Sequence, residues 1–162
     1  MEIRFVTEDD DLFEISNIYE SSWKYAYQNM IPQHYLDSIP MGMWVDRLKQ
    51  QERNNLILVE NGKLIGAASY EKARWEQYCD YGEIMSIYLL PNYINKGYGK
   101  KLFIACVENL LKSRFDKIML WVLEDNFKAR EFYRKNGFIC SEIYKDDNIG
   151  GKNLKEVLYV FK

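Results

Sequence analysis

Hydrophobic and polar positions in the first third of the chain predict a strand followed by a helical region. Glu2 to Val6 alternate as the residues of a half-buried strand do. Thr7 and Asp10 then resemble a capping box at the start of a helix. The apolar residues that recur at helical spacing in that helix are Leu12, Ile15, Ile18, Tyr19 and Trp23. Pro32 suits the first turn of a short helix through Ile39, and a further helical turn is expected around Trp44 to Leu48.

The middle of the chain predicts a hairpin and then a central strand. Leu56 to Glu60 and Lys63 to Glu71 are strand-like and flank Asn61-Gly62, the commonest chemistry for a two-residue turn. Glu83 to Leu90 is almost continuously apolar, as expected of a strand covered on both faces, and Pro91 ends it. Simple alternation along this strand places Glu83 on the same face as Ile87 and Leu89.

The rest of the chain predicts a long helix, a strand, a short helix and a last pair of strands. Apolar positions at helical spacing describe a helix from Gly97 to Arg114, and Lys117 to Leu123 is a buried strand. The remaining expected elements are a helix at Phe127 to Asn136, a strand at Phe138 to Tyr144, a polar turn at Asp146 to Asn153 and a strand at Leu154 to Phe161. Together they predict one mixed α/β domain over residues 1–162, without linker or repeat.

Composition fits a globular protein and excludes several partners. The 162 residues are 48% hydrophobic and 28% charged, with a net charge of −2. Such a charge gives no general attraction to nucleic acid or to an anionic membrane. The longest apolar run, Ile84 to Leu90, is far below the roughly 20 residues of a membrane span, and the N-terminus lacks a signal-peptide core. A cytoplasmic protein that binds neither nucleic acid nor membrane is expected.

The histidine and cysteine content argues against a metal site. His34 is the only histidine, and Cys79, Cys106 and Cys140 lie too far apart for the paired spacing of zinc ligands. Three unpatterned cysteines suit reduced thiols better than a disulfide framework. A catalytic triad would have to use His34, so this chemistry is disfavoured.

A glycine-containing segment at the start of the long helix is the strongest sign of ligand binding. It reads Asn95-Lys96-Gly97-Tyr98-Gly99-Lys100 and directly follows the central strand and Pro91. Free amides at a helix start favour anions such as a pyrophosphate, and glycines let the backbone approach the ligand. A dinucleotide fingerprint would need a third glycine where Leu102 and Phe103 stand, and there is no Walker motif. A helix start with solvated lysines remains the alternative interpretation.

A second motif favours ligand binding over a purely structural helix start. A strand is followed by Asn126-x-x-Ala129-x-x-Phe132-Tyr133-x-x-x-Gly137-Phe138. The order of strand, proline, glycine loop, helix, strand and this motif resembles the GNAT acetyltransferase superfamily, closely from Gly82 to Phe138. Ser22-Trp23, Tyr27, Ile31-Pro32 and Leu36 are similar to the acceptor-side segment of many small bacterial members. The resemblance implies the GNAT fold, a mixed and largely antiparallel central sheet flanked by helices.

The resemblance also implies acetyl-CoA as co-substrate and assigns residues to it. The backbone of Ile87, Tyr88 and Leu89 is expected to pair with the pantetheine, with Asn126 close to it. The expected pyrophosphate cradle consists of Asn95, Lys96, Gly97, Tyr98, Gly99 and Lys100. Members usually carry Gln or Arg three residues before the first loop glycine, whereas this chain has Ile94. Because the expected donors are backbone amides, Ile94 should weaken or reshape cofactor binding without abolishing it.

The resemblance implies two catalytic residues for direct acetyl transfer to an amine. Tyr133 matches the tyrosine that protonates the departing thiolate, and its alternative role is that of a core tyrosine. Glu83 matches a glutamate that takes a proton from the amine, and its alternative role is that of a solvated carboxylate at the strand end. A backbone N–H near Leu89 could polarise the thioester carbonyl.

The acceptor side is assigned to the early aromatic residues. Trp23 and Tyr27 could hold a cationic amine by cation–π attraction, or they could be ordinary core residues. A small polyamine or amino sugar is favoured as acceptor over a protein N-terminus or lysine, and a homodimer is left open. The alternative function is that of a non-catalytic acyl-CoA-binding or sensing module, against which the presence of both Glu83 and Tyr133 argues.

Overall fold

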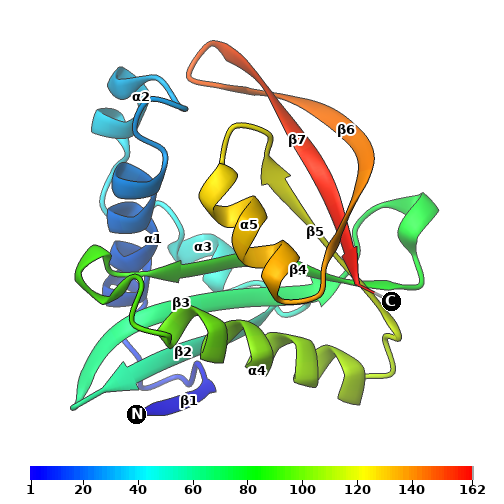
Figure 1. Ribbon diagram of the computed structural model, residues 1–162. Helices are drawn as coiled ribbons and strands as arrows, with labels where there is room; N and C mark the ends of the chain where they lie inside the picture. The colour runs from blue at the N-terminus through cyan, green and yellow to red at the C-terminus, as the bar shows by residue number, and fades with distance from the viewer. Residues whose placement is uncertain (162) are drawn as a thin grey trace.

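One sheet forms the centre of the molecule in this computed structural model, which describes residues 1–161. The seven strands of the described residues lie in the order β1-β2-β3-β4-β5-β7-β6 (Figure 1). All neighbours are antiparallel except β4 and β5, which are parallel. The strands are β1 (Glu2–Phe5), β2 (Asn54–Glu60), β3 (Lys63–Lys72), β4 (Tyr81–Leu89), β5 (Lys117–Leu123), β6 (Ile139–Ile149) and β7 (Lys152–Phe161). The predicted mixed, largely antiparallel α/β fold is confirmed.

Helices cover both faces of this sheet. They are α1 (Leu12–Ala26), α2 (Gln33–Ser38), α3 (Val45–Leu48), α4 (Tyr98–Lys112) and α5 (Phe127–Lys135), with short 3-10 turns η1 (Glu76–Tyr78) and η2 (Pro91–Tyr93). One core cluster joins the sheet to α4 and α5 and includes Leu58, Phe103 and Phe138. A second joins the opposite face to α1 and includes Ile18 and Ile57. The central strand β4 is therefore covered on both sides, as its apolar sequence predicts.

The contact between β4 and β5 is short. Only three residue pairs join the two strands, from Tyr81 with Lys117 to Glu83 with Met119. Beyond Glu83 the strands diverge, and Figure 1 shows β5 turning away while β4 continues beneath α5. The remainder of β4 keeps its partner β3, but no strand within residues 1–161 pairs with its other edge. We call this opening the β4–β5 seam.

A β-bulge on β4 changes which side chains share a face. Ser69 pairs with Ser86, but the next residue, Tyr70, pairs with Ile84, so Met85 has no partner. A bulge of this kind shifts the alternation of the strand by one residue. Glu83 therefore lies opposite Glu71, on the α1 face of the sheet with Ser86. The prediction that Glu83 shares a face with Ile87 and Leu89 is wrong, because alternation alone contains no sign of the bulge.

Two other local predictions need correction. The polar segment Asp146 to Asn153 is mostly strand, because its polar residues pair across an exposed hairpin and leave only Gly150-Gly151, both at positive φ, as the turn. Thr7 does not cap α1. Its amide and hydroxyl donate to Asp10, while Asp11 caps the helix by accepting from Phe13 N. The local bonds at Thr7 and Asp10 form one turn ahead of the helix.

Candidate active site

The loop before α4 presents a run of free backbone amides. Among the described residues, the amides from Asn95 to Lys100 make no backbone hydrogen bond, and the first intrahelical bond is from Lys101 N to Gly97 O, at 3.3 Å. Asn95 and Gly97 both have positive φ, at 62° and 85°, which turns the chain sharply into the helix. Consecutive amides at a helix N-terminus form an anion-binding site.

The two glycines keep this loop open to a ligand. A Cβ built on Gly97 would meet nothing within 4 Å, and one on Gly99 would lie 3.6 Å from Leu89 Cδ1. The space above the backbone is therefore empty of protein, as a close approach by phosphate oxygens requires. Tyr98 turns its side chain away, and its hydroxyl donates to Glu60 at 3.2 Å. Tyr98 can thus contribute only its amide to an anion.

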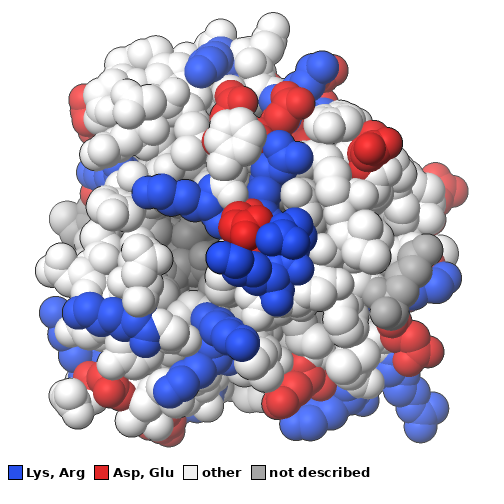
Figure 2. All heavy atoms as spheres, in the orientation of Figure 1, with Lys and Arg blue, Asp and Glu red and all other residues white. Residues whose placement is uncertain are grey.

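Positively charged side chains surround the surface near the loop before α4. Figure 2 shows lysine and arginine side chains around a hollow between β4 and α5. Lys96 and Lys100 in the loop are exposed, and α5 carries Lys128, Arg130, Arg134 and Lys135. These cations raise the local concentration of a polyanionic ligand although the whole chain has a net charge of −2.

The open edge of β4 lies inside the β4–β5 seam. Leu90 N donates to Ile65 O at 2.9 Å, so the alternation of the antiparallel ladder turns the amides of Ile87 and Leu89 away from β3 and into the seam. The carbonyl of Leu89 accepts a 2.6 Å bond from the Ser22 hydroxyl on α1. The Leu89 amide remains available to an entering ligand, as does the backbone of Ile87.

Asn126 and Ile94 lie outside the run of free amides. Asn126 caps α5, where its side-chain oxygen accepts from Ala129 N at 3.2 Å. This use leaves its amide nitrogen free. Ile94 follows η2, and its amide donates to Pro91 O at 3.2 Å. The side chain that replaces the usual Gln or Arg is therefore an apolar one at the edge of the amide run.

Tyr133 lies on α5 with its ring packed into the core, and its hydroxyl makes no hydrogen bond to another described residue. Its ring centroid is 6.0 Å from that of Phe103 and 6.3 Å from that of Tyr159. Burial raises the pKa of Tyr133 and the Tyr88 phenol raises it further, while no hydrogen bond acts on it. The phenol is therefore neutral and able to donate.

Glu83 is 2% exposed and belongs to a cluster of charged groups. Its carboxylate accepts from the Arg74 guanidinium at 3.3 Å and from the Arg74 amide at 3.4 Å. Glu71, opposite Glu83 on β3, lies 3.6 Å from Arg74 and 3.9 Å from Arg53. The interpretation of Glu83 as a solvated strand-end carboxylate is wrong, because this end of β4 is buried. Arg74 itself is 52% exposed, so the cluster borders solvent on one side.

Trp23 and Tyr27 meet β4 at the other side of the seam. Trp23 Nε1 donates to the Tyr88 hydroxyl at 2.9 Å, and the Tyr27 hydroxyl lies 3.5 Å from the same oxygen. Burial raises the pKa of Tyr88 to about 12. The Trp23 ring is 5.0 Å from that of Tyr27 and 5.6 Å from that of Trp44. The two residues thus form one aromatic wall with Tyr88, whose side chain faces α1.

Comparison with known proteins decides the family. The family model described as "Acetyltransferase (GNAT) family" matches residues 12–138. The chain belongs to the GNAT acetyltransferase family. The expectation of an acetyl-CoA-dependent N-acetyltransferase is thereby confirmed at the level of the family.

Individual relatives cover most of this GNAT chain. "Uncharacterized N-acetyltransferase YuaI" of Bacillus subtilis is 32% identical over 152 residues, which are 91% of this chain and 86% of the relative. Spermidine N(1)-acetyltransferase of Thermoplasma acidophilum is 23% identical over 138 residues, 80% of this chain and 83% of the relative.

Solved structures share the fold at lower identity. PaiA N-acetyltransferase of Thermoplasma acidophilum, in complex with coenzyme A, superposes with a TM-score of 0.74 at 21% identity, covering 100% of this chain and 99% of that chain. Ribosomal-protein-alanine N-acetyltransferase of Brucella melitensis superposes with a TM-score of 0.74 at 18% identity, covering 99% and 98%. These matches confirm the GNAT fold.

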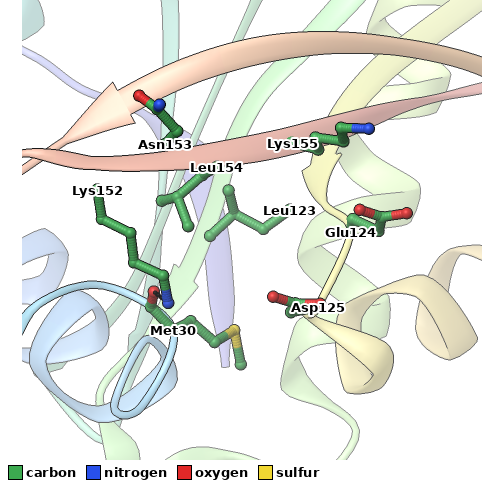
Figure 3. Close-up of a pocket in the computed structure, with 8 residues that line it drawn as sticks. All are labelled: Met30, Leu123, Glu124, Asp125, Lys152, Asn153, Leu154 and Lys155. Atoms are coloured by element: carbon green, nitrogen blue, oxygen red, sulfur yellow. Dashed lines mark hydrogen bonds between the residues drawn. The ribbon is translucent and has the colours of Figure 1, made fainter.

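A small cavity opens beside the aromatic wall of the GNAT chain. It has a volume of about 140 Å³ and lies where β5 ends and β7 begins, next to the loop after α1 (Figure 3). Lys152 closes it by donating to Met30 O at 3.0 Å. Leu123 and Leu154, which line it, share a core cluster with Trp23 and Tyr27. The cavity therefore adjoins the face of the sheet on which Glu83 and Tyr88 lie.

Several side chains at this GNAT site carry no recognisable motif. Ser22 is one of them. Ser86 is another, and it links the Tyr19 hydroxyl at 3.0 Å to the Ser69 hydroxyl at 2.8 Å. Arg74 is a third. Because these contacts join residues far apart in the chain, they leave no local sequence pattern. Ser22 is the exception in one respect, since it directly precedes Trp23, which the sequence does indicate as a candidate.

Neither a metal cluster nor a membrane-spanning helix is present in the described part of the chain. Within residues 1–161, no cluster of three or more His, Cys, Asp or Glu side chains is arranged to hold a metal ion. No described helix is long and apolar enough to cross a membrane.

Proposed function

We propose that this protein moves the acetyl group of acetyl-CoA directly to the primary amine of a small cationic acceptor such as a polyamine. One observation carries the proposal: β4 and β5 diverge after three residue pairs, and candidate groups for both substrates border this seam on the two faces of the sheet. The amide loop, the free edge of β4 and Tyr133 border it on the α4 and α5 side. Glu83 and Tyr88 border it on the α1 side. Donor and acceptor could therefore meet there from opposite directions.

Each chemical demand of the transfer has a candidate group at the seam. Bound acetyl-CoA supplies a thioester. The Leu89 amide could donate to the thioester oxygen, which gains negative charge during attack. Tyr133, neutral because burial raises its pKa, could give its proton to the departing sulfur.

Glu83 is the proposed proton acceptor for the amine. A general base needs a site for the proton, and Glu83 Oε1 lies 3.3 Å from the Arg74 guanidinium, which holds the side chain in place. Because Glu83 is buried, a proton would reach it directly from an amine in the seam or through an intervening water. The partly exposed Arg74 side gives the proton a way out to solvent.

A small cation is favoured as acceptor for two reasons. Aromatic side chains and carboxylates line the acceptor face, a combination that attracts ammonium groups. One relative, which aligns with this chain over 83% of its own length, is named as a spermidine N(1)-acetyltransferase. Trp23 and Tyr27 are the proposed wall of the acceptor site. Because their rings pack against each other, they can define the shape of the space that receives the amine.

A thiol-release assay with acetyl-CoA tests the proposal. The acceptor panel contains polyamines, aminoglycosides, amino acids and peptides with a free N-terminus or a lysine. Rapid release with polyamines and slow release with peptides is the expected result. Acetyl-CoA binding in calorimetry without thiol release from any amine would favour the alternative of an acyl-CoA-binding module. Rapid release with peptides alone would overturn the choice of a small acceptor.

A further inference from the structure

An ammonium group from the protein itself occupies an aromatic cage on the acceptor face. Lys145 Nζ lies 4.8 Å from the ring centroid of Trp75 and 4.8 Å from that of Trp121. The two ring centroids are 5.7 Å apart with the planes tilted by 59°. Glu156 Oε2 completes the site at 2.9 Å from Lys145 Nζ. Two aromatic faces and one carboxylate are the groups that proteins use to bind ammonium ligands.

Four separate segments build this cage. Lys145 on β6 and Glu156 on β7 are directly paired across the hairpin. Trp121 comes from β5, and Trp75 precedes η1 in the connection between β3 and β4. The register of β6 shifts between Cys140 and Tyr144, with Glu142 at a φ of 61°, just before Lys145. A bulge of this kind re-aims the side chains that follow it.

Two buried polar groups of the cage have no hydrogen-bond partner among the described residues. The indole Nε1 atoms of both Trp75 and Trp121 are buried without a hydrogen-bond partner, which packing normally avoids. The Lys145 side chain is 27% exposed and that of Glu156 is 19% exposed, so solvent reaches the ion pair. A ligand of similar charge could therefore reach the cage by replacing the Lys145 ammonium.

The cage lies on the same face of the sheet as the proposed acceptor site. Trp121 follows Met119 by two residues on β5, and Met119 pairs with Glu83 at the closed end of the seam. Glu156 lies opposite Leu123, a residue that also lines the cavity of Figure 3. The negative charge of Glu156 also extends to the aromatic wall, because it contributes to the raised pKa of Tyr88 beyond the larger effect of burial.

We propose that Trp75, Trp121 and Glu156 form a subsite for a second, non-reacting ammonium group of the acceptor, and that Lys145 fills this subsite until the acceptor displaces it. The inference rests on the proposed function and narrows its substrate class to diamines and polyamines. One nitrogen of such an acceptor is acetylated near Glu83 while another is held in the cage. Lys145 thereby acts as a tethered competitor that selects against weakly bound monoamines.

Two substitutions with opposite expected effects test the subsite. Lys145→Met removes the competing ammonium and keeps an unbranched side chain, so the KM for 1,4-diaminobutane should fall by about 3- to 30-fold. Glu156→Gln removes the anion, so the same KM should rise by about tenfold. The KM for n-butylamine, which has no second cation, should change less than about twofold in both variants. Lys112→Met, at the exposed end of α4, controls for the loss of one positive charge.

The possible outcomes separate the subsite from the proposed function. Similar KM changes for the diamine and the monoamine, or none, would overturn the subsite while acetyl transfer to amines stood. Thermal unfolding identifies a purely structural ion pair, since both variants would then lose stability with unchanged KM values. If no amine released thiol, calorimetry with 1,4-diaminobutane would still test the cage. Tighter binding to Lys145→Met than to the parent would support it, and equal binding would overturn it.

Discussion

The Ser22 hydroxyl donates a 2.6 Å hydrogen bond to the carbonyl oxygen of Leu89, which lies 67 residues later in the chain. Ser22 is buried on α1, and Leu89 ends the strand whose other edge faces the seam. The bond satisfies a carbonyl that has no neighbouring strand to pair with. It also fixes the peptide that directly follows the Leu89 amide, which is the group proposed to face the thioester.

Ser22→Ala should lower both stability and donor affinity. Loss of the donor leaves the Leu89 carbonyl without its buried partner, at a cost of about 1 to 3 kcal/mol. For a chain of this size the melting temperature should fall by a few degrees. The KM for acetyl-CoA should rise, because the edge of β4 is less well fixed. Ser21→Ala, on the same helix, should change neither quantity, and equal effects of the two substitutions would contradict the assigned role.

Gly99→Val should weaken acetyl-CoA binding while leaving the fold intact. Gly99 has an ordinary φ, and an added Cβ lies at normal contact distance from Leu89, so the free protein tolerates it. The side chain would instead occupy the space above the amide run, and we expect at least a tenfold loss of affinity, or about 1.4 kcal/mol. Calorimetry measures it, with melting temperature as control. Unchanged affinity in a folded variant would remove the loop from the donor site.

Tyr133→Phe should lower kcat by about 10² to 10⁴ with little change in the KM for acetyl-CoA. The ring packing is kept, and only the proton donor is lost. Because burial raises the pKa of Tyr133, the phenol stays protonated as the pH rises, so kcat of the parent should not fall up to about pH 9.5. Tyr25→Phe, at an exposed position on α1, is the matched control. A loss below about threefold would return Tyr133 to the role of a core tyrosine.

Glu83→Gln should lower kcat/KM, most strongly at low pH, where the acceptor is an ammonium ion and most needs a base. The expected loss is about 10² to 10⁴. Glu71→Gln is a matched control, since Glu71 is buried on the same face and shares Arg74. It should reduce stability with a smaller effect on rate. A pH profile of Glu83→Gln with the height and shape of the parent profile would exclude Glu83 as the base.

Local sequence patterns predicted most of the fold and the glycine-containing helix start at α4, because those features depend on residues close in the chain. Asn61 and Gly62 in the hairpin turn and Gly97 before α4 all have positive φ, a conformation that these residue types favour. The β4 bulge depends on how β3 and β4 pair, so alternation alone placed Glu83 on the wrong face. Polar strands on an exposed hairpin resemble a loop in sequence, which explains the error at Asp146 to Asn153.

The proposed acceptor side was the least predictable part of the candidate site. Trp75, Trp121, Lys145 and Glu156 come from four elements, and none carries a motif. Their meeting requires the strand order β4-β5-β7-β6, which short-range patterns do not contain. Trp23 and Tyr27 could be identified from the sequence because they are close together in it. Their contacts with Tyr88, which is 65 residues from Trp23 and 61 residues from Tyr27, could not be predicted.

The divergence of β4 and β5 after three residue pairs has a consequence for hydrogen exchange. A central strand normally holds the slowest-exchanging amides of a domain, since they open only with global unfolding. In β4 the amides of Tyr88 and Leu90 face β3, whereas those of Ile87 and Leu89 face the seam. Protection should therefore alternate from residue to residue along the middle of the sheet. A donor that pairs with this edge would slow the two fast amides and make the alternation disappear.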